Sequence, residues 1–299
     1  GGFALKTENG AINVTGTEAT PVPLHAEGTS SGIVEAGGPG KYKDALTLRY
    51  VDIAAGGAQY GVKAADGKVT AENVTITTPG SATEYGIYAS NGAVSLTNVT
   101  VGADDAYPKC GIYIQHFPSD ADAAVLDRVT VFAGGSTSTD VNERTGIYGG
   151  NKKLTLTNSS VTVKGDDYTA VYVNTGDGVL VESSTLTAPG GTALYTNSDT
   201  TIRDSSLSGK FGHEADAKTT FESGTITGTE KAALVSGVLI VEDLAELSGK
   251  LVGQTDASVY IEKTPANAEY SVEGDFKNLY IKMTPAVPAD PDVEGSTET

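Results

Sequence analysis

The chain is poor in the side chains that most often carry chemistry: its 299 residues include one cysteine and three histidines. Cys110 has no second cysteine with which to form an internal disulfide, and its place just before a Gly-Ile-Tyr segment predicts packing, not reactivity. The histidines His25, His116 and His213 are far apart and have no neighbouring nucleophile, and His116 is expected in a surface loop. A catalytic triad or a zinc site is therefore not expected.

Basic side chains and long apolar runs are also scarce. The sequence has 20 Lys and Arg against 38 Asp and Glu, a formal net charge of −18. Because such a surface repels phosphate, nucleic acid and anionic membranes are not expected as partners. An acidic surface suits cations or neutral sugars, and it also keeps an extracellular protein soluble. No apolar run is long enough to predict a transmembrane segment.

A short motif recurs along the chain at a nearly constant interval. Its copies are Gly86-Ile87-Tyr88, Gly111-Ile112-Tyr113, Gly146-Ile147-Tyr148, Ala170-Val171-Tyr172 and Ala193-Leu194-Tyr195. The first residues of these copies, with Gly61 before them, are 25, 25, 35, 24 and 23 residues apart. Each copy is followed by a run of alternating apolar and polar residues. Such a repeat predicts one structural unit stacked on copies of itself.

The alternation has a period of two, which is typical of strands with one buried face. Two or three short strands per repeat fit a sandwich, a propeller or a solenoid. A propeller blade needs roughly 40 residues, more than this repeat has, and the hairpin signals of a sandwich are few. The sequence therefore predicts an all-β fold, a right-handed parallel β-helix (solenoid) of about ten coils with end caps.

We expect a single β-helix domain over residues 1–283. Residues 17–43, rich in proline and glycine, and residues 258–283 are candidate N-terminal and C-terminal caps, because the open ends of a solenoid expose unpaired strand edges. Residues 284–299 combine proline and acidic side chains with almost no large apolar ones, which predicts a linker or tail. The chain begins without a methionine or a signal peptide, so an export signal removed from it is a further hypothesis.

The third residue of the motif is predicted to face solvent, because the aligned residues of other repeats are Lys63 and Glu214. Tyrosines at this position would form a strip on the order of 20 Å tall. One interpretation is a structural ladder of stacked rings, worth ~0.5 to 1.5 kcal/mol per pair. The other is a platform on which sugar rings or a partner's apolar side chains lie flat. The candidate ligand-binding residues are Tyr88, Tyr113, Tyr148, Tyr172 and Tyr195.

Loops that lead into each copy of the motif are expected to stack along one edge. Their acidic residues are Asp104, Asp105, Asp140, Glu143, Asp166 and Asp167. This acidic loop lip could bind calcium or a cationic ligand, but solvated acidic loops are commoner and no Asp-x-Asp-x-Asp-Gly loop is present. We therefore expect no cofactor and keep calcium as the alternative. An insertion over residues 115–122 and 133–143 is the predicted place for specificity.

A polar turn position also recurs, before the second buried pair of each repeat. Stacked amides at this position would hydrogen-bond along the rod as a structural ladder. The position holds Asn73, Asn98, Asn158, Ser183, Asp204 and Ser223, and Arg128 interrupts the series.

One stretch carries a family resemblance: Tyr85-Gly-Ile-Tyr-Ala-Ser-Asn-Gly-Ala-Val-Ser-Leu-Thr-Asn-Val-Thr-Val101, with its counterparts over residues 45–250. It resembles the passenger domains of bacterial autotransporters and related adhesins of the pectin-lyase-like right-handed β-helix superfamily. The resemblance implies a secreted or cell-surface bacterial rod, adhesive or structural. We expect it to recognise carbohydrate or a host surface protein.

The same superfamily includes polysaccharide lyases and polygalacturonase-like hydrolases, which is the enzyme alternative. The hydrolase motifs Asn-Thr-Asp, Gly-His-Gly and Arg-Ile-Lys are absent. Asp166-Asp167 and Gly212-His213-Glu214 match them only in fragments. We therefore expect a non-enzymatic binding or structural protein, with a passive surface spacer as a further alternative.

Overall fold

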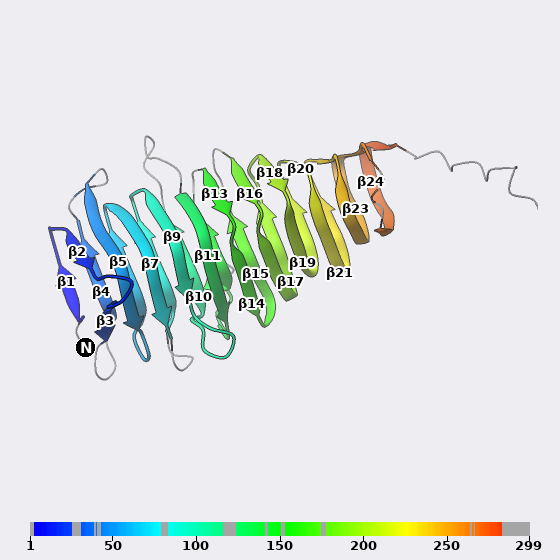
Figure 1. Cartoon of the computed structure of the whole chain (residues 1–299). Coiled ribbons are helices and arrows are strands. Elements are labelled where there is room, and N and C mark those ends of the chain that lie inside the picture. Colours follow the sequence, from blue (N-terminus) through cyan, green and yellow to red (C-terminus); the bar gives the residue numbers. More distant parts are fainter. Residues whose placement is uncertain are drawn as a thin grey trace, which may run out of the picture.

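The computed structural model describes residues 3–25, 31–38, 40, 43–78, 83–115, 124–140, 143–150, 153–174, 178–263, 265 and 267–282. Their regular elements are β-strands, β1 to β24. All pairings between these strands are parallel. Figure 1 shows them following one another along an elongated molecule. The described chain is an all-β parallel solenoid, as the sequence predicts at this level.

The pairings fall into three series, and each series forms one face. The tyrosine face begins with β1 (Leu5–Thr7), β4 (Gly32–Gly37), β6 (Tyr60–Ala65), β8 (Tyr85–Ser90), β10 (Cys110–Gln115), β12 (Thr145–Gly149) and β15 (Asp166–Val173). The charged face includes β2 (Ile12–Thr15), β13 (Leu154–Thr157), β16 (Val179–Glu182), β18 (Thr200–Arg203), β20 (Lys218–Phe221) and β22 (Val238–Val241). The hydroxyl face includes β3 (Val22–His25) and β14 (Ser160–Lys164).

Longer strands bend from one face onto the next. The charged and hydroxyl faces share β5 (Asp44–Ala54), β7 (Lys68–Thr77), β9 (Val94–Val101) and β11 (Ala124–Gly134). The hydroxyl and tyrosine faces share β17 (Thr185–Thr196), β19 (Ser205–Ala215) and β21 (Gly224–Val235). All three faces share β23 (Leu244–Ile261) and β24 (Asn267–Ile281).

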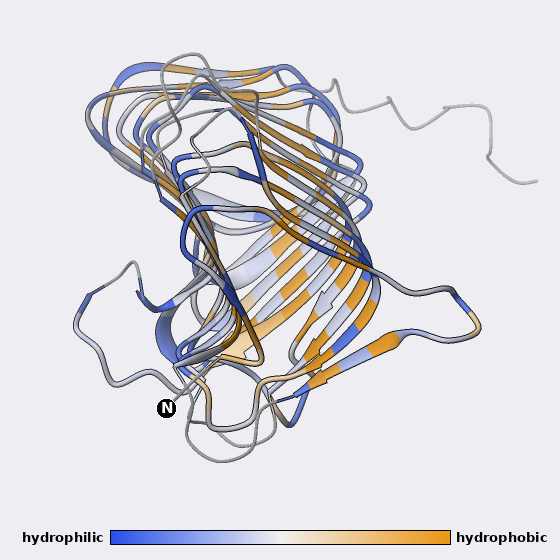
Figure 2. Ribbon diagram, turned by 90° about the vertical axis from the view of Figure 1, so that its left-hand side faces the viewer, coloured by the Kyte–Doolittle hydropathy of each residue, from blue (hydrophilic) through white to orange (hydrophobic). Residues whose placement is uncertain are grey.

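Alternation within the strands builds the core. Every second side chain points inward and stacks on its equivalent in the next strand, because the pairing is parallel and in register. One such row joins Val62, Ile87, Ile112, Ile147 and Val171, all at most 2% exposed. Apolar segments of successive strands accordingly line up side by side in Figure 2.

The glycine that opens each early copy of the motif is explained by close packing. A Cβ at Gly86 would lie 2.2 Å from Cγ1 of Val101, and a Cβ at Gly111 would lie 2.3 Å from Cγ1 of Val131. These distances are far below ordinary van der Waals contact. The tripeptide therefore passes where two faces meet most closely, with room for no side chain at these two positions.

The polar turn position is the corner between the charged and hydroxyl faces, where the backbone is left-handed. The φ angles are 54° at Asn73, 53° at Asn98, 52° at Arg128 and 51° at Asn158. Asparagine tolerates this conformation better than most residues. Asn98 Nδ2 donates to Asn73 Oδ1 at 2.6 Å, whereas Asn158 Nδ2 donates to Asp127 Oδ1 at 2.8 Å. The predicted amide ladder is therefore interrupted at Arg128.

The two segments proposed as caps contain strands of the solenoid. Within residues 17–43, β3 and β4 pair in parallel with β5 and β6. Within residues 258–283, the end of β23 and most of β24 continue the same faces. The tail at 284–299 lies outside the described residues. No separate element of the described chain lies across either end of the solenoid (Figures 1 and 2).

Candidate functional site

The structure brings the five candidate tyrosines together on the tyrosine face. Tyr88, Tyr113, Tyr148, Tyr172 and Tyr195 occupy matching positions of consecutive strands. Their ring centroids are 5.3, 4.6, 5.7 and 4.6 Å apart in chain order, and their planes are inclined by only 8°, 10°, 14° and 9°. We call these five residues the tyrosine strip.

The stacking decides what the tyrosine strip presents to a partner. Each ring lies face to face with the next, so the inner faces are covered; Tyr148, at the centre, is only 7% exposed. A sugar ring that lies flat on an aromatic residue needs a free face. The other four tyrosines of the strip are partly exposed, so any carbohydrate contact there is made through their ring edges or hydroxyls.

Two further tyrosines widen the strip at its N-terminal end. Tyr60 and Tyr85 stack at 5.5 Å and 12°, and both meet Tyr88 edge-on, at 5.6 and 5.5 Å. The motif analysis missed them because they precede Gly61 and Gly86, one position outside the tripeptide. An aromatic residue at the same place in two consecutive repeats was the available signal.

Burial and neighbouring acids keep the phenols of this region protonated. Burial raises the pKa of Tyr85, and the carboxylate of Glu143 raises it further. The Tyr85 hydroxyl donates to Glu143 Oε1 at 3.3 Å, and the Tyr195 hydroxyl donates to Asp216 Oδ2 at 2.8 Å. Tyr88 donates to Gln115 Oε1 at 2.5 Å. The edge of the strip is therefore a row of neutral hydrogen-bonding groups.

At least three carboxylates of the predicted acidic loop lip are engaged by individual partners. Asp104 Oδ1 lies 2.8 Å from Lys164 Nζ, and Asp167 Oδ2 lies 3.6 Å from Arg144 Nη1. Glu143 accepts the hydrogen bond from Tyr85. These carboxylates meet different strands and different counter-groups, so the structure does not join them into one site.

The other three acids of the lip, Asp105, Asp140 and Asp166, are exposed. Nowhere in the part of the chain that the structure describes do three His, Cys, Asp or Glu residues come together as a metal ion would require. Calcium at this lip stays a prediction that the geometry does not support.

A cavity of about 190 Å³ lies beside the strip, and we call it the loop pocket. Its walls carry two carboxylates, Glu84 and Glu143, the ammonium group of Lys109, the ring of Tyr85, and the segment 136–138, Ser-Thr-Ser. Gln59 Nε2 donates to Glu84 Oε2 at 2.7 Å and so fixes that carboxylate. Segment 136–138 belongs to the insertion predicted to confer specificity, whereas residues 116–122 of that insertion and His116 lie outside the described residues.

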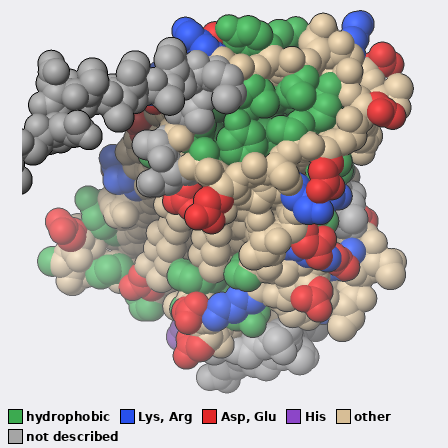
Figure 3. Space-filling view, turned by 90° about the vertical axis from the view of Figure 1, so that its right-hand side faces the viewer, with side chains coloured by type: hydrophobic (Ala, Val, Ile, Leu, Met, Phe, Trp, Pro, Cys, Tyr) green, Lys and Arg blue, Asp and Glu red, His purple; other side chains and the backbone are tan. Residues whose placement is uncertain are grey.

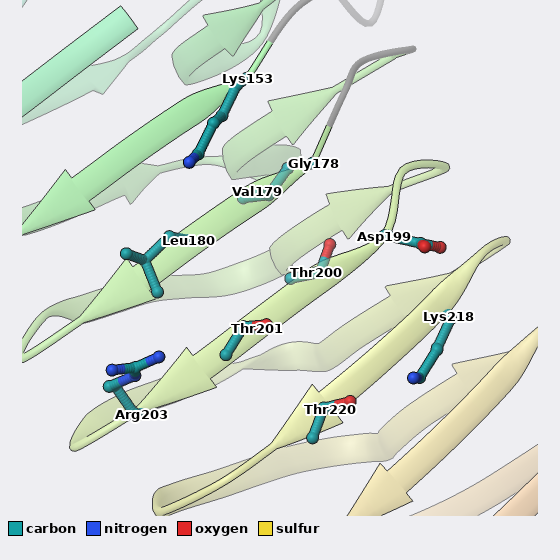
Figure 4. A pocket seen from close by; sticks show the side chains of 10 residues that line it. All are labelled: Lys153, Gly178, Val179, Leu180, Asp199, Thr200, Thr201, Arg203, Lys218 and Thr220. Carbon is teal, nitrogen blue, oxygen red and sulfur yellow. The ribbon is translucent and has the colours of Figure 1, made fainter. Parts of the chain in front are cut away.

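A second concavity, of about 370 Å³, is an open groove on the charged face. Figure 4 shows Leu180, Thr201 and Thr220 on successive strands, with Lys153 and Lys218 at the same face. Arg203 also lines the groove, but it pairs with Glu182 and Glu222 at 3.6 and 3.1 Å. The groove is larger than the loop pocket, and the one carboxylate among its described lining residues is that of Asp199.

Cys110 and His213 both belong to the interior. Cys110 is fully buried and its Sγ lies 3.3 Å from Thr145 Oγ1; burial raises the pKa of its thiol to about 12. His213 is fully buried as well, with Nδ1 3.1 Å from the Leu194 carbonyl. Neither group is placed for surface chemistry. The fragment Gly212-His213-Glu214 is therefore a piece of core strand.

No protein-family model, no curated protein and no solved structure matches this chain. The fold and the site therefore define its class by themselves: an all-β parallel solenoid with a stacked tyrosine strip and an adjoining polar pocket. The described residues contain no helix with the length and hydropathy that crossing a membrane requires.

Proposed function

We propose that this chain is a secreted or cell-surface bacterial binding rod, non-enzymatic, that recognises carbohydrate of a host or cell surface. In this proposal it is a right-handed parallel β-helix of about ten coils, at ~4.8 Å per coil, of the pectin-lyase-like kind. The continuous parallel register over the described residues and the resemblance of the repeat support this assignment.

The observation that carries the proposal is that Tyr85 lines the loop pocket and also packs against the tyrosine strip, so the two surfaces are continuous. The ring of Tyr85 packs edge-on against Tyr88 and Tyr113, while its hydroxyl reaches Glu143 across the pocket. Sugars present alternating hydroxyl groups and apolar C–H surface. A site with fixed carboxylates, an amine, hydroxyls and an aromatic edge matches that alternation.

The first test removes the polar groups of the pocket one at a time. Tyr85→Phe deletes only the hydroxyl, and Lys109→Ala deletes the amine; each is expected to weaken glycan binding by about tenfold, the cost of one good hydrogen bond. Glycan arrays identify the ligand and titration calorimetry measures the affinity. Lys218→Ala in the charged-face groove is the control, with unchanged affinity expected. If the pocket variants bind like the parent chain, carbohydrate recognition at this site is wrong.

The second test addresses the tyrosine strip. Tyr113→Ala and Tyr148→Ala should lower binding if ring edges contact the ligand, and Tyr148→Phe should lower it less because the ring remains. Unchanged binding in both alanine variants would leave the strip as a purely structural ladder.

One observation favours the enzyme alternative: Lys109 lines the same cavity as Glu84 and Glu143. A polysaccharide lyase needs a base, often Lys or Arg, beside acidic residues that would bind calcium, because the carboxylates alone would repel a developing carbanion. Incubation with pectin, alginate and glycosaminoglycans would then produce ultraviolet absorbance from unsaturated products, and Lys109→Ala would abolish it. We expect no such absorbance. A spacer without any ligand is the outcome if both binding and turnover are absent.

A further inference from the structure

Both ends of the described solenoid carry strands that are paired on one side only. At the C-terminal end, β24 pairs with β23 and with no other described strand. At the N-terminal end, β1 pairs with β4, and β2 pairs with β5. An unpaired parallel edge is a template for another strand of the same direction.

The C-terminal end also exposes apolar side chains. Leu279 is 47% exposed and Tyr280 is 48% exposed, the highest values among the large apolar residues of the described chain. Val272 and Ile281 are only partly buried against the core. Figure 3 shows this end with a broad apolar area bordered by charged side chains.

The N-terminal end faces the viewer in the ribbon diagram of Figure 2, and its outermost core side chains are partly exposed. Leu5, Ile12 and Val14 lie at core positions but are only partly buried, because no described strand stacks on them from outside. The two ends are therefore halves of the same kind of packing: inward-facing aliphatic rows on which no further described strand stacks.

We propose that these two ends bind each other, so that copies of this chain associate head to tail. The strand register within one copy specifies which residues of the two ends would stack. Following the inward rows strand by strand, Leu5 belongs to the row that ends at Val272, and Ile12 belongs to the row that ends at Leu279. Val14 likewise belongs to the row of Ile281. A second copy added in register places aliphatic on aliphatic in all three rows.

On the tyrosine face, the side chains that would meet at the junction carry opposite charges. Lys6 and Glu273 are the first and last described members of the outward row that contains the tyrosine strip. Within each copy, Lys6 lies 3.5 Å from Glu35 and Glu273 lies 2.9 Å from Lys250. Stacking sets Lys6 of one copy about 4.8 Å along the axis from Glu273 of the other, so charges alternate across the junction.

The geometry also fixes the type and strength of this association. The two surfaces differ, so the contact is heterologous and does not close after two copies. On the hydroxyl face one strand position stays empty at the junction. The chain begins on the tyrosine face with β1 and reaches the hydroxyl face only with β3, so the first coil has no strand to stack on the hydroxyl part of β24. The contact therefore covers two faces of three, and the assembly is expected to be weak and dependent on concentration.

Sedimentation velocity of the full chain from micromolar to millimolar concentration tests the proposal. We expect the mean mass to rise with concentration through dimers and longer rods. Ile12→Glu and Leu279→Lys each put an unpaired charge into the junction, and each should raise the dissociation constant at least about tenfold. Circular dichroism and the melting temperature check that each variant is folded.

Mixing the two variants provides the decisive control. In the mixture, Ile12 of the Leu279→Lys variant meets Leu279 of the Ile12→Glu variant, which is the unaltered junction, so heterodimers should form while neither variant associates alone. Growth beyond two copies needs the other junction, in which the two substituted positions, of opposite charge, face each other. Chains that stay monomeric throughout the concentration range overturn the proposal. So does association that begins only after residues 285–299 are deleted, because the tail would then be the occupant of the C-terminal end.

Discussion

His213 is the residue whose environment departs most from what its type suggests. It occupies an inward row between Leu194 and Ala233, meets Phe221 edge-on at 5.8 Å, and hydrogen-bonds through both ring nitrogens, to the Leu194 carbonyl and to Thr219 Oγ1 at 2.9 Å. Burial lowers the pKa of the imidazole from 6.5 to about 4, while the backbone carbonyl and Asp216 oppose that shift. The core therefore holds this side chain in its neutral form.

The shift predicts how stability depends on pH. The unfolded chain takes up a proton near pH 6.5 and the folded chain only near pH 4, so the free energy of unfolding falls as the pH drops through this window and levels off below it. The loss amounts to about 3 kcal/mol at its full extent. His213→Leu should remove this component, which urea titrations of both chains at several pH values would measure as a difference. If the free energy of unfolding of the parent chain and of His213→Leu changes equally with pH, His213 is not the group responsible for the loss.

At the scale of the element, the corner between the charged and hydroxyl faces changes its chemistry along the rod. The residue after the left-handed position is buried valine in the earlier coils, as at Val99 and Val129. At the next three corners it is serine: Ser159, Ser184 and Ser205. Val129 N–H donates to Ser159 Oγ at 2.9 Å, and the N–H groups of Ser159 and Ser184 each donate to the next serine hydroxyl at 3.1 Å. At this corner, serine hydroxyls thus replace backbone carbonyls as the acceptors for backbone N–H groups. We call these stacked serines, Ser159, Ser184 and Ser205, the serine column.

The serine column predicts that deleting one hydroxyl oxygen lowers the stability of the fold appreciably. Ser184→Ala leaves the buried N–H of Ser159 without its acceptor, which costs about 1–3 kcal/mol of stability. Ser160→Ala on the outward side of the same corner is the control and should change stability by less than about 0.5 kcal/mol. Chemical denaturation measures both, and equal effects would show that the column contributes nothing particular.

The repeated tripeptide predicted the in-register tyrosines because parallel pairing repeats each side chain at the same place. The corner position was predicted only as a ladder of polar side chains. Its left-handed backbone was not predicted, because arginine, which occupies the position at Arg128, does not indicate a positive φ. The loop pocket was beyond prediction for another reason. It assembles residues from three separate strand connections, and their meeting depends on how far Lys109 and segment 136–138 fold over Tyr85.

At the scale of the whole molecule, net charge opposes compactness. The chain carries −18, and three consecutive strands of the charged face are followed by glutamates, Glu222, Glu242 and Glu262. Like charges on adjacent strands repel one another. The ion pairs nearby are exposed, and such pairs contribute little. Repulsion should therefore dominate the response to salt.

We expect the melting temperature to rise as ionic strength increases from ~0.01 to ~0.15 M, because the screening length falls from about 30 to 8 Å over that range. Glu242→Gln removes the central charge of the three. It should raise the melting temperature at low salt and flatten the salt dependence, as differential scanning calorimetry would measure. A melting temperature that falls with salt would mean that the ion pairs outweigh the repulsion.

The ordered phenol rings also have an optical consequence. The sequence has 14 tyrosines and no tryptophan, so near-ultraviolet transitions of the folded chain come chiefly from tyrosine. Parallel rings 4.6 to 5.7 Å apart couple their excited states. The near-ultraviolet dichroism of this molecule should thus be dominated by one array of chromophores, and the loss of that signal on heating would report directly on the separation of adjacent coils.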